Sequence, residues 1–191
     1  VESLEPGSRV SGEYANSGEI LKATVSKQYE IGAKYDHGAV SLTAAAFRIE
    51  RTNVMEQMID GERYLKQNGM TLYRGIEASG SFRVSPNFRF GLGAIYLDGQ
   101  IRDADPYGDI DTSGNRPAEL AKWQLLANAE YYVAAIPGLS IHGNVRRTGK
   151  APTDDTNRLY LPGFTLANLG MQYATEIGGQ KVVFTGNVNN I

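Results

Sequence analysis

Hydrophobic and polar residues alternate along the segment AKWQLLANAEYYV, which runs from Ala121 to Val133. Its odd-numbered positions are all apolar, and most of its even-numbered positions are polar. A period of two over this length predicts an extended strand with one apolar and one polar face. In a soluble barrel the apolar face would line the core, whereas in an outer-membrane barrel it would face lipid.

The same alternation recurs in other segments, separated by turn signals. We predict further strands near residues 26–35, 39–51, 72–84, 88–101, 139–146, 167–173 and 182–189. Short turns are expected at 36–38, 85–87, 135–138 and 177–179, and long connections around 51–69, 103–116 and 149–158. Asp60-Gly61 gives a type I′ hairpin signal inside the first long connection. The pattern predicts an all-β chain that forms one continuous antiparallel up-and-down meander of about eight strands.

Three features favour an apolar face that is turned outward, toward lipid. Short turns at one end and long loops at the other are the rule for outer-membrane barrels. The apolar face is rich in Ala and Gly, which is light for a packed protein core. Aromatic residues gather beside the short turns, as at a membrane interface: Tyr35, Phe82, Phe88, Phe90, Tyr131, Tyr132 and Tyr173. The residues therefore predict a segment of a transmembrane β-barrel, with Trp123 as a lipid-facing interface anchor.

The loop rule also predicts an orientation. Short turns lie on the periplasmic side, so the first strand descends from outside and the eighth climbs away from its periplasmic turn. A complete bacterial barrel would start and end on the periplasmic side. We therefore expect residues 1–191 to be part of a larger barrel.

Composition narrows the function further. The chain has 191 residues, 19 Lys and Arg against 21 Asp and Glu, and a net charge of −2, so a nucleic-acid partner is not indicated. It has no Cys, which excludes disulfides, thiolate metal sites and cysteine nucleophiles. It also has no run of about 18 apolar residues, so no transmembrane helix is expected.

No catalytic or metal site is predicted. The acidic segment 103–114 approaches EF-hand spacing, with Asp103, Asp105, Gly108, Asp109 and Asp111. Its fifth position is Tyr107, however, and its twelfth is Gly114, where a bidentate Glu is required. The segment RTGKAPT lacks the glycine and the hydroxyl residue of a P-loop, and neither His37 nor His142 has a partner at ligand spacing.

Charged residues of the polar face form the better constellation. With the apolar face outward, six of them line the lumen: Glu30, Glu77, Arg83, Arg89, Glu130 and Arg146. There they could form hydrogen bonds or ion pairs with a second protein segment inside the barrel. The alternative is that a water-filled lumen is simply polar.

Several segments in order resemble the barrel of TonB-dependent siderophore receptors. They are SGEILKATVSKQYEIGAKYD, YRGIEASGSFRVSPNFRFGLGAIYLDGQI, GNRPAELAKWQLLANAEYYV, LYLPGFTLANLGMQY and GNVNNI. Ala23 stands where the family usually has proline. The resemblance implies a bacterial outer-membrane barrel of the 22-stranded plugged class, of which residues 1–191 would be the C-terminal portion, without the plug domain, the TonB box or the closing strand.

The same resemblance implies the partners and the cargo. They are a ferric siderophore, the protein's own plug, TonB and the lipid bilayer, with no cofactor, because iron travels inside its chelator. Expected ligand contacts are cationic, aromatic and polar residues near the outer vestibule: Tyr107, Arg116, Lys122, Gln124 and Tyr160. We predict a transporter rather than an enzyme. The alternatives are another cargo (haem, cobalamin or a glycan), a passive porin-like barrel, or a soluble lipocalin-like binder with its apolar face inward.

Overall fold

A computed structural model describes residues 9–22, 24–102 and 111–191. The strands in this part of the chain are β1 (Ser26–His37), β2 (Val40–Ile59), β3 (Glu62–Ser85), β4 (Phe88–Arg102), β5 (Trp123–Tyr132), β6 (Leu139–Thr148), β7 (Ala151–Pro152), β8 (Tyr160–Leu161), β9 (Phe164–Ile177) and β10 (Gln180–Val188). Over the same residues, no helix is long and apolar enough to cross a membrane.

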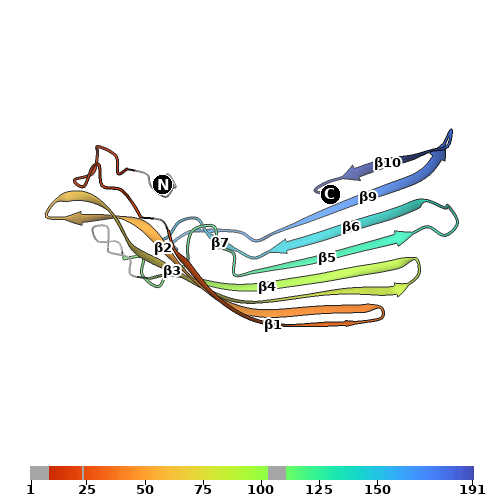
Figure 1. The fold of residues 1–191 in the computed structure, drawn as a ribbon, viewed down its shortest axis with the longest axis horizontal. Helices are drawn as coiled ribbons and strands as arrows, with labels where there is room; N and C mark the ends of the chain where they lie inside the picture. The colour runs from red at the N-terminus through yellow and green to blue at the C-terminus, as the bar shows by residue number, and fades with distance from the viewer. Residues whose placement is uncertain (1–8, 23, 103–110) are drawn as a thin grey trace.

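Eight of these strands form one antiparallel sheet in the order β1-β2-β3-β4-β5-β6-β9-β10, so each strand of this sheet pairs with the next one of the sheet along the chain. Figure 1 shows them side by side as one curved sheet. The predicted up-and-down meander is confirmed. β7 and β8 form a separate two-stranded ladder inside the connection from β6 to β9, which the sequence pattern did not indicate.

The connections differ in length at the two ends of the sheet, as predicted. The short turns β1–β2, β3–β4, β5–β6 and β9–β10 lie together at one end, on the right in Figure 1. We call this the turn end and the opposite end the loop end. At the β9–β10 turn, Gly178 and Gly179 have φ of 61° and 79°. A two-residue type I′ turn requires positive φ at both positions, which glycine adopts freely.

The first long connection, expected around residues 51–69, is a hairpin, as the Asp60-Gly61 signal predicted, and its two arms are paired rather than forming an open loop. β2 and β3 remain paired up to Ile59 and Glu62, with one register shift between Asn53 and Met55. The turn itself lies where the sequence predicted it, since Asp60 and Gly61 have φ of 53° and 83°. Backbone hydrogen bonds continue the ladder beyond the point where the apolar alternation stops. The extension projects past the other strands, at the left of Figure 1.

Buried apolar side chains are few and lie toward the loop end. Residues 9–22 fold against the projecting hairpin, and Val10, Leu21 and Leu65 form a small cluster there, each at most 6% exposed. Asn16 fastens this segment: its Nδ2 donates to the Leu65 carbonyl at 2.8 Å, and its Oδ1 accepts from the Leu65 amide at 3.0 Å. We call residues 9–22 together with hairpin residues 52–69 the outer lobe.

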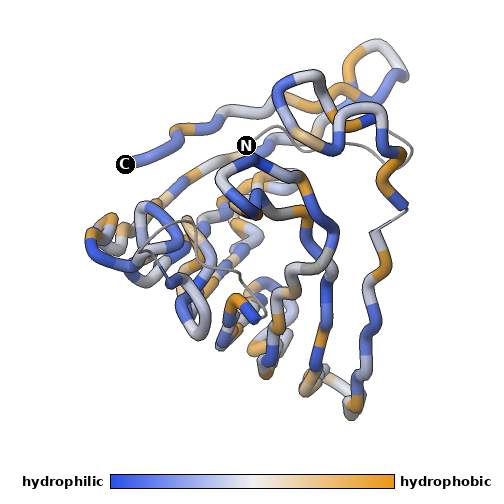
Figure 2. Tube along the Cα trace, turned by 90° about the vertical axis from the view of Figure 1, so that its left-hand side faces the viewer, coloured by the Kyte–Doolittle hydropathy of each residue, from blue (hydrophilic) through white to orange (hydrophobic). Residues whose placement is uncertain are grey.

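The sheet has an apolar face without a protein core beneath it. Ile31, Ile76 and Leu92 share this face and are 77%, 61% and 51% exposed. Figure 2 shows hydrophobic and hydrophilic residues alternating along the strands. From Ile31 to Tyr35 on β1, and at the paired positions on β2, β3, β4 and β5, no residue with this parity is Asp, Glu, Lys or Arg.

The opposite, polar face lines the hollow side of the sheet. A hollow of about 800 Å³ is bounded by side chains from four strands, including Ser81, Arg89, Asn128 and His142. A second, of about 670 Å³, is bounded by Glu30, Lys34, Glu77 and Gln124 among others. Side chains of non-adjacent strands enclose a common space only on the concave face of a curved sheet. The polar face is therefore the inner wall, and a soluble binder with its apolar face inward is excluded.

The apolar face has the dimensions of a membrane belt. On β4 it runs from Phe88 to Tyr96, about 27 Å along the strand at about 3.4 Å per residue, or about 20 Å in height for a tilt of about 40°. Outer-membrane barrels have an apolar band about 25 Å tall. Phe82 and Phe90 stack at 4.8 Å near the turn end, and Tyr96 pairs with Trp123 near the loop end. Aromatic side chains thus border the belt on both sides.

Candidate functional site

The inner wall carries an ion pair that borders the first hollow. Arg89 on β4 lies directly opposite Glu130 on β5, and its Nε donates to Glu130 Oε2 at 2.7 Å. Its Nη2 also donates to the Tyr132 hydroxyl at 2.7 Å. Tyr132 was expected among the aromatic residues at the membrane interface. This contact corrects that expectation, because it places Tyr132 on the inner wall. Its even-numbered position on β5 is the sequence signal for that placement.

The other predicted lumen residues share the inner wall but are not joined to one another. Glu30 accepts a hydrogen bond from Gln28 at 3.0 Å, and Glu77 lines the second hollow. Within the described ranges, no ion pair engages Glu77, Arg83 or Arg146. Their charged groups therefore remain available to a second body or to water.

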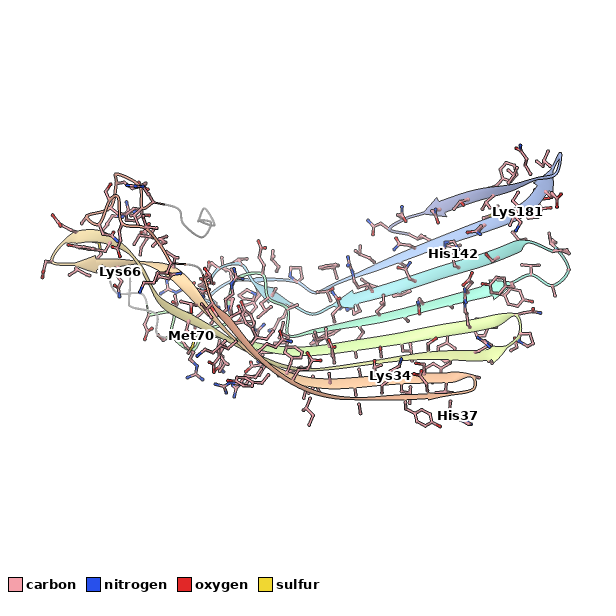
Figure 3. All side chains as sticks on the ribbon, in the orientation of Figure 1. Lys34, His37, Lys66, Met70, His142 and Lys181 are labelled. Atoms are coloured by element: carbon pink, nitrogen blue, oxygen red, sulfur yellow. The ribbon has the colours of Figure 1, made fainter. Side chains whose placement is uncertain are left out.

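Sequence reasoning missed a set of neutral polar contacts on the same wall. Thr43 and Ser79 hydroxyls are 2.6 Å apart, and Asn168 Nδ2 donates to Asn144 Oδ1 at 2.9 Å. His142 Nε2 lies 3.2 Å from Asn187 Oδ1. Figure 3 labels His142 on β6 and Lys34 on β1, at two places on the curved sheet. All these residues occupy strand positions on the same face as the charged ones, and this alternation was the sequence signal that could have indicated them. Together they make a wall of hydrogen-bonding groups.

At the loop end, two connections far apart in sequence are fastened together. The Arg116 amide donates to Asn157 Oδ1 at 3.1 Å, and Asn157 Nδ2 donates to the Arg116 carbonyl at 2.7 Å. Asp155 Oδ1 accepts from the Ala118 amide at 2.7 Å. Hydrogen bonds from the Thr156 hydroxyl and amide hold the pKa of Asp154 below its usual range, so this carboxylate stays charged and keeps its turn closed.

This fastening brings two cations to one aromatic ring. The Arg116 guanidinium carbon lies 6.0 Å from the centre of the Tyr160 ring, and Lys150 Nζ lies 4.9 Å from it. Arg116 Nε is buried and has no hydrogen-bond partner in the part of the chain that the structure describes. We call Arg116, Lys150 and Tyr160 the loop cluster. Arg116 and Tyr160 were predicted ligand contacts, whereas Lys150 was missed because only the fold brings it to Tyr160.

The remaining predicted ligand residues lie apart from this cluster. Tyr160 belongs to β8 and does not begin the strand after the loop, since β9 begins at Phe164. Lys122 lies at a bend before β5, with Nζ 3.8 Å from Asp98 Oδ1. Gln124 points to the inner wall, where it donates to Thr148 at 3.2 Å. Tyr107 falls outside the described residues.

No metal site is formed in the described ranges, where no group of three or more His, Asp or Glu side chains is placed to hold an ion. Most of the acidic segment 103–114 falls outside those ranges. Its Asp111 accepts a hydrogen bond from the Ser113 amide at 2.8 Å, which is a local turn contact.

Comparisons with known proteins agree with this geometry. Over residues 5–191 the chain matches the family model described as TonB dependent receptor-like, beta-barrel. It is 28% identical over 197 residues to the ferrichrome receptor FcuA of Yersinia enterocolitica. The aligned region covers 100% of this chain and 25% of that protein. It is 27% identical over 179 residues to the ferrioxamine receptor of the same species, covering 90% of this chain and 24% of the receptor.

A solved structure has the same fold. The chain resembles BauA, the ferric preacinetobactin receptor of Acinetobacter baumannii, with a TM-score of 0.80 and 27% identity, covering 97% of this chain and 28% of the receptor. The chain thus spans about a quarter of the length of the curated relatives that it matches. With a curved antiparallel sheet, an apolar outer face and a polar inner wall, this chain belongs to the β-barrel family of TonB-dependent receptors.

Proposed function

We propose that this chain forms part of the barrel of an outer-membrane receptor that imports ferric siderophores. The observation that supports this most strongly is the opposite character of the two faces: an exposed apolar belt outside and a wall of charged and amide groups inside. A lipid-facing band around a polar lumen has this form. The matched relatives are named as receptors for ferrichrome and ferrioxamine.

A larger barrel would complete the sheet. β1 and β10 are edge strands, each paired on one side only. Unpaired backbone groups cost several kcal/mol each in lipid, so membrane barrels close their edges. Further strands from the rest of a longer receptor would pair with β1 and β10. The inner wall, including Arg89, Glu130 and the unpaired Glu77, then offers hydrogen-bonding groups to a plug inside the barrel.

The loop cluster is the proposed contact with the cargo. Cations beside an aromatic ring suit an iron chelate, because the ring can stack on its organic framework while Arg and Lys meet its negative oxygens. The Arg116 guanidinium beside the ring supplies charged hydrogen-bond donors. Iron would remain inside the chelator, so the protein would need neither metal ligands nor a cofactor. Import would be driven through TonB acting on the plug.

Complementation of a deletion strain tests the function. The full-length receptor should restore growth under iron limitation on one or a few individual ferric chelates, and should restore uptake of labelled iron. A receptor that restores growth on none of the chelates, or that works equally well without TonB, would contradict the proposal.

Alanine variants test the site in the same strain. Arg116→Ala, Lys150→Ala and Tyr160→Ala should each reduce uptake while the barrel assembles normally. Arg158→Ala is the matched control: it removes an exposed cation from the same connection and should leave uptake unchanged. Lys122→Ala, Gln124→Ala and Tyr107→Ala test the other predicted contacts. Wild-type uptake by all three cluster variants would place the ligand contacts elsewhere.

A further inference from the structure

Arginine residues occupy the outward face just above the apolar belt at the loop end. Arg48 follows Ala46 on β2, two residues along the same face, and Arg74 precedes Ile76 on β3 in the same way. Arg147 has the same parity at the end of β6. At the turn end, no Lys or Arg in the described strands has this parity. Outward cations thus gather at one margin of the belt only.

Arg48 and Arg74 are direct cross-strand partners. Side chains so placed have Cβ atoms about 4.5–5.5 Å apart, and like charges in this position repel. Both side chains are about half exposed, at 48% and 47%, so an anion can reach them from outside. An anion between them would turn the repulsion into an attraction.

The neighbouring carboxylates neutralise this site only in part. Glu50 engages the Nε and Nη2 of Arg48 at 3.1 and 2.7 Å through a single oxygen. Asp98 is shared: its Oδ2 lies 3.5 Å from Arg74 and its Oδ1 lies 3.8 Å from Lys122. Three cations therefore share two carboxylates, and the contact of Arg74 with Asp98, at 3.5 Å, is longer than that of Arg48 with Glu50. The site keeps an excess of positive charge.

We propose that Arg48 and Arg74 together bind a phosphate group of an anionic lipid headgroup in the leaflet at the loop end. The site lies where headgroups begin, directly above exposed Ile76 and two residues beyond the level of the Tyr96–Trp123 pair. Guanidinium groups recognise phosphate through paired hydrogen bonds. A lipid, unlike a free anion, would also cover the apolar residues below the arginines. The inference rests on the proposed function only in requiring that the apolar face meets lipid.

Lipid binding to the full-length receptor tests this directly. The detergent-solubilised receptor is titrated with phosphatidic acid or with zwitterionic phosphatidylcholine, and bound lipid is counted by native mass spectrometry. The wild type should prefer phosphatidic acid by about 25-fold, from about fivefold for each arginine near a membrane surface. The double variant Arg48→Gln with Arg74→Gln should lose this preference. No preference in the wild type, or full preference in the double variant, overturns the proposal.

A matched control separates the site from the overall charge. Arg83→Gln with Arg146→Gln removes two arginines from the inner wall and should keep the wild-type preference; an equal loss there would show that net charge alone is responsible. Inorganic phosphate should not displace the bound lipid, and displacement would assign the site to free anions. If the double variant does not assemble, Arg74→Lys takes its place. This change keeps the positive charge but removes the paired N–H donors of the guanidinium group, so an unchanged lipid preference overturns the proposal.

Siderophore uptake measured on the same variants keeps this inference distinct from the proposed function. Loss of lipid preference with normal uptake supports the lipid site. Failure of the wild type to import any chelate would contradict the transport proposal and leave the lipid measurement valid.

Discussion

The side chain of Asn157 binds the backbone of Arg116 twice, accepting from its amide at 3.1 Å and donating to its carbonyl at 2.7 Å. The two residues lie 41 positions apart in the chain. Asn157 has a φ of 57°, in the left-handed region that Asn tolerates better than most residues. One side chain therefore fixes the position from which Arg116 reaches Tyr160.

Replacing Asn157 with Gly should weaken chelate binding without removing any residue of the loop cluster. Glycine accepts the positive φ, so the change removes the two hydrogen bonds, each contributing on the order of 1 kcal/mol. Arg116 then loses its fixed position beside Tyr160. Binding of the cognate ferric chelate to the full-length receptor, measured by fluorescence quenching, should weaken by up to about tenfold. Asn144→Gly on the inner wall is the control, and equal weakening there would contradict this interpretation.

The outer lobe should open at both extremes of pH. The Tyr14 hydroxyl donates to Glu56, and Arg63 pairs with Glu56 at 2.8 Å and covers the Tyr14 ring. The hydrogen bond from Tyr14, followed by that from Arg63, lowers the pKa of Glu56 below 4.5. The same bond to Glu56 raises the pKa of Tyr14 above 10.0. The stabilisation is thus present between these values, lost as pH falls through the lowered pKa of Glu56, and lost as pH rises through the raised pKa of Tyr14.

Spin labels at Glu13 and Glu62, both exposed, would report this opening in the full-length receptor. The distance between the labels should be narrowly distributed near pH 7 and should broaden at either extreme. Tyr14→Phe should broaden it at pH 7, whereas Tyr64→Phe on the same hairpin should not. A distribution that does not change with pH would show that the apolar cluster of Val10, Leu21 and Leu65 holds the lobe by itself.

A charge on the outer face should be far more costly than the same charge on the inner wall. Ala127 lies midway between Trp123 and Tyr131 on the apolar side of β5, whereas Leu126 borders both inner hollows. Ala127→Arg should destabilise the receptor by about 2–4 kcal/mol if it sits at the bilayer midplane. Leu126→Arg should cost much less. Unfolding by guanidinium from lipid vesicles measures both, and equal costs would contradict the assignment of the faces.

Gly138 should not tolerate a side chain. It has a φ of 88°, and an added Cβ would lie 2.0 Å from the Ala174 carbonyl oxygen on β9. The left-handed conformation alone costs a residue with a Cβ about 1–2 kcal/mol, and the clash with a backbone atom adds to it. Gly138→Ala should therefore lower the yield of assembled, heat-modifiable receptor. Gly12→Ala, which meets no atom within 4 Å, should assemble normally.

The strands and their faces were predictable because they depend on local patterns. The alternation of Trp123, Leu125 and Ala127 with Gln124 and Asn128 specifies which side chains share a face, whatever the rest of the chain does. The Asp60-Gly61 turn depends on two residues that accept positive φ, and it formed as predicted. Pairing of successive strands then follows from short connections.

Contacts between segments far apart could not be predicted from such patterns. The alternation ends near Arg51, so the pattern predicted the Asp60-Gly61 turn but not the strand pairing that leads to it, and nothing periodic indicated that Asn16 would bind Leu65. Lys150 meets Tyr160 because a two-stranded ladder folds their connection back on itself. Hydrogen bonds of single polar side chains give no repeating signal, and their partners are decided by how the loops pack. The sequence by itself determined a two-faced β-sheet, and only the tertiary structure decided which side of it is hollow and which loop residues meet.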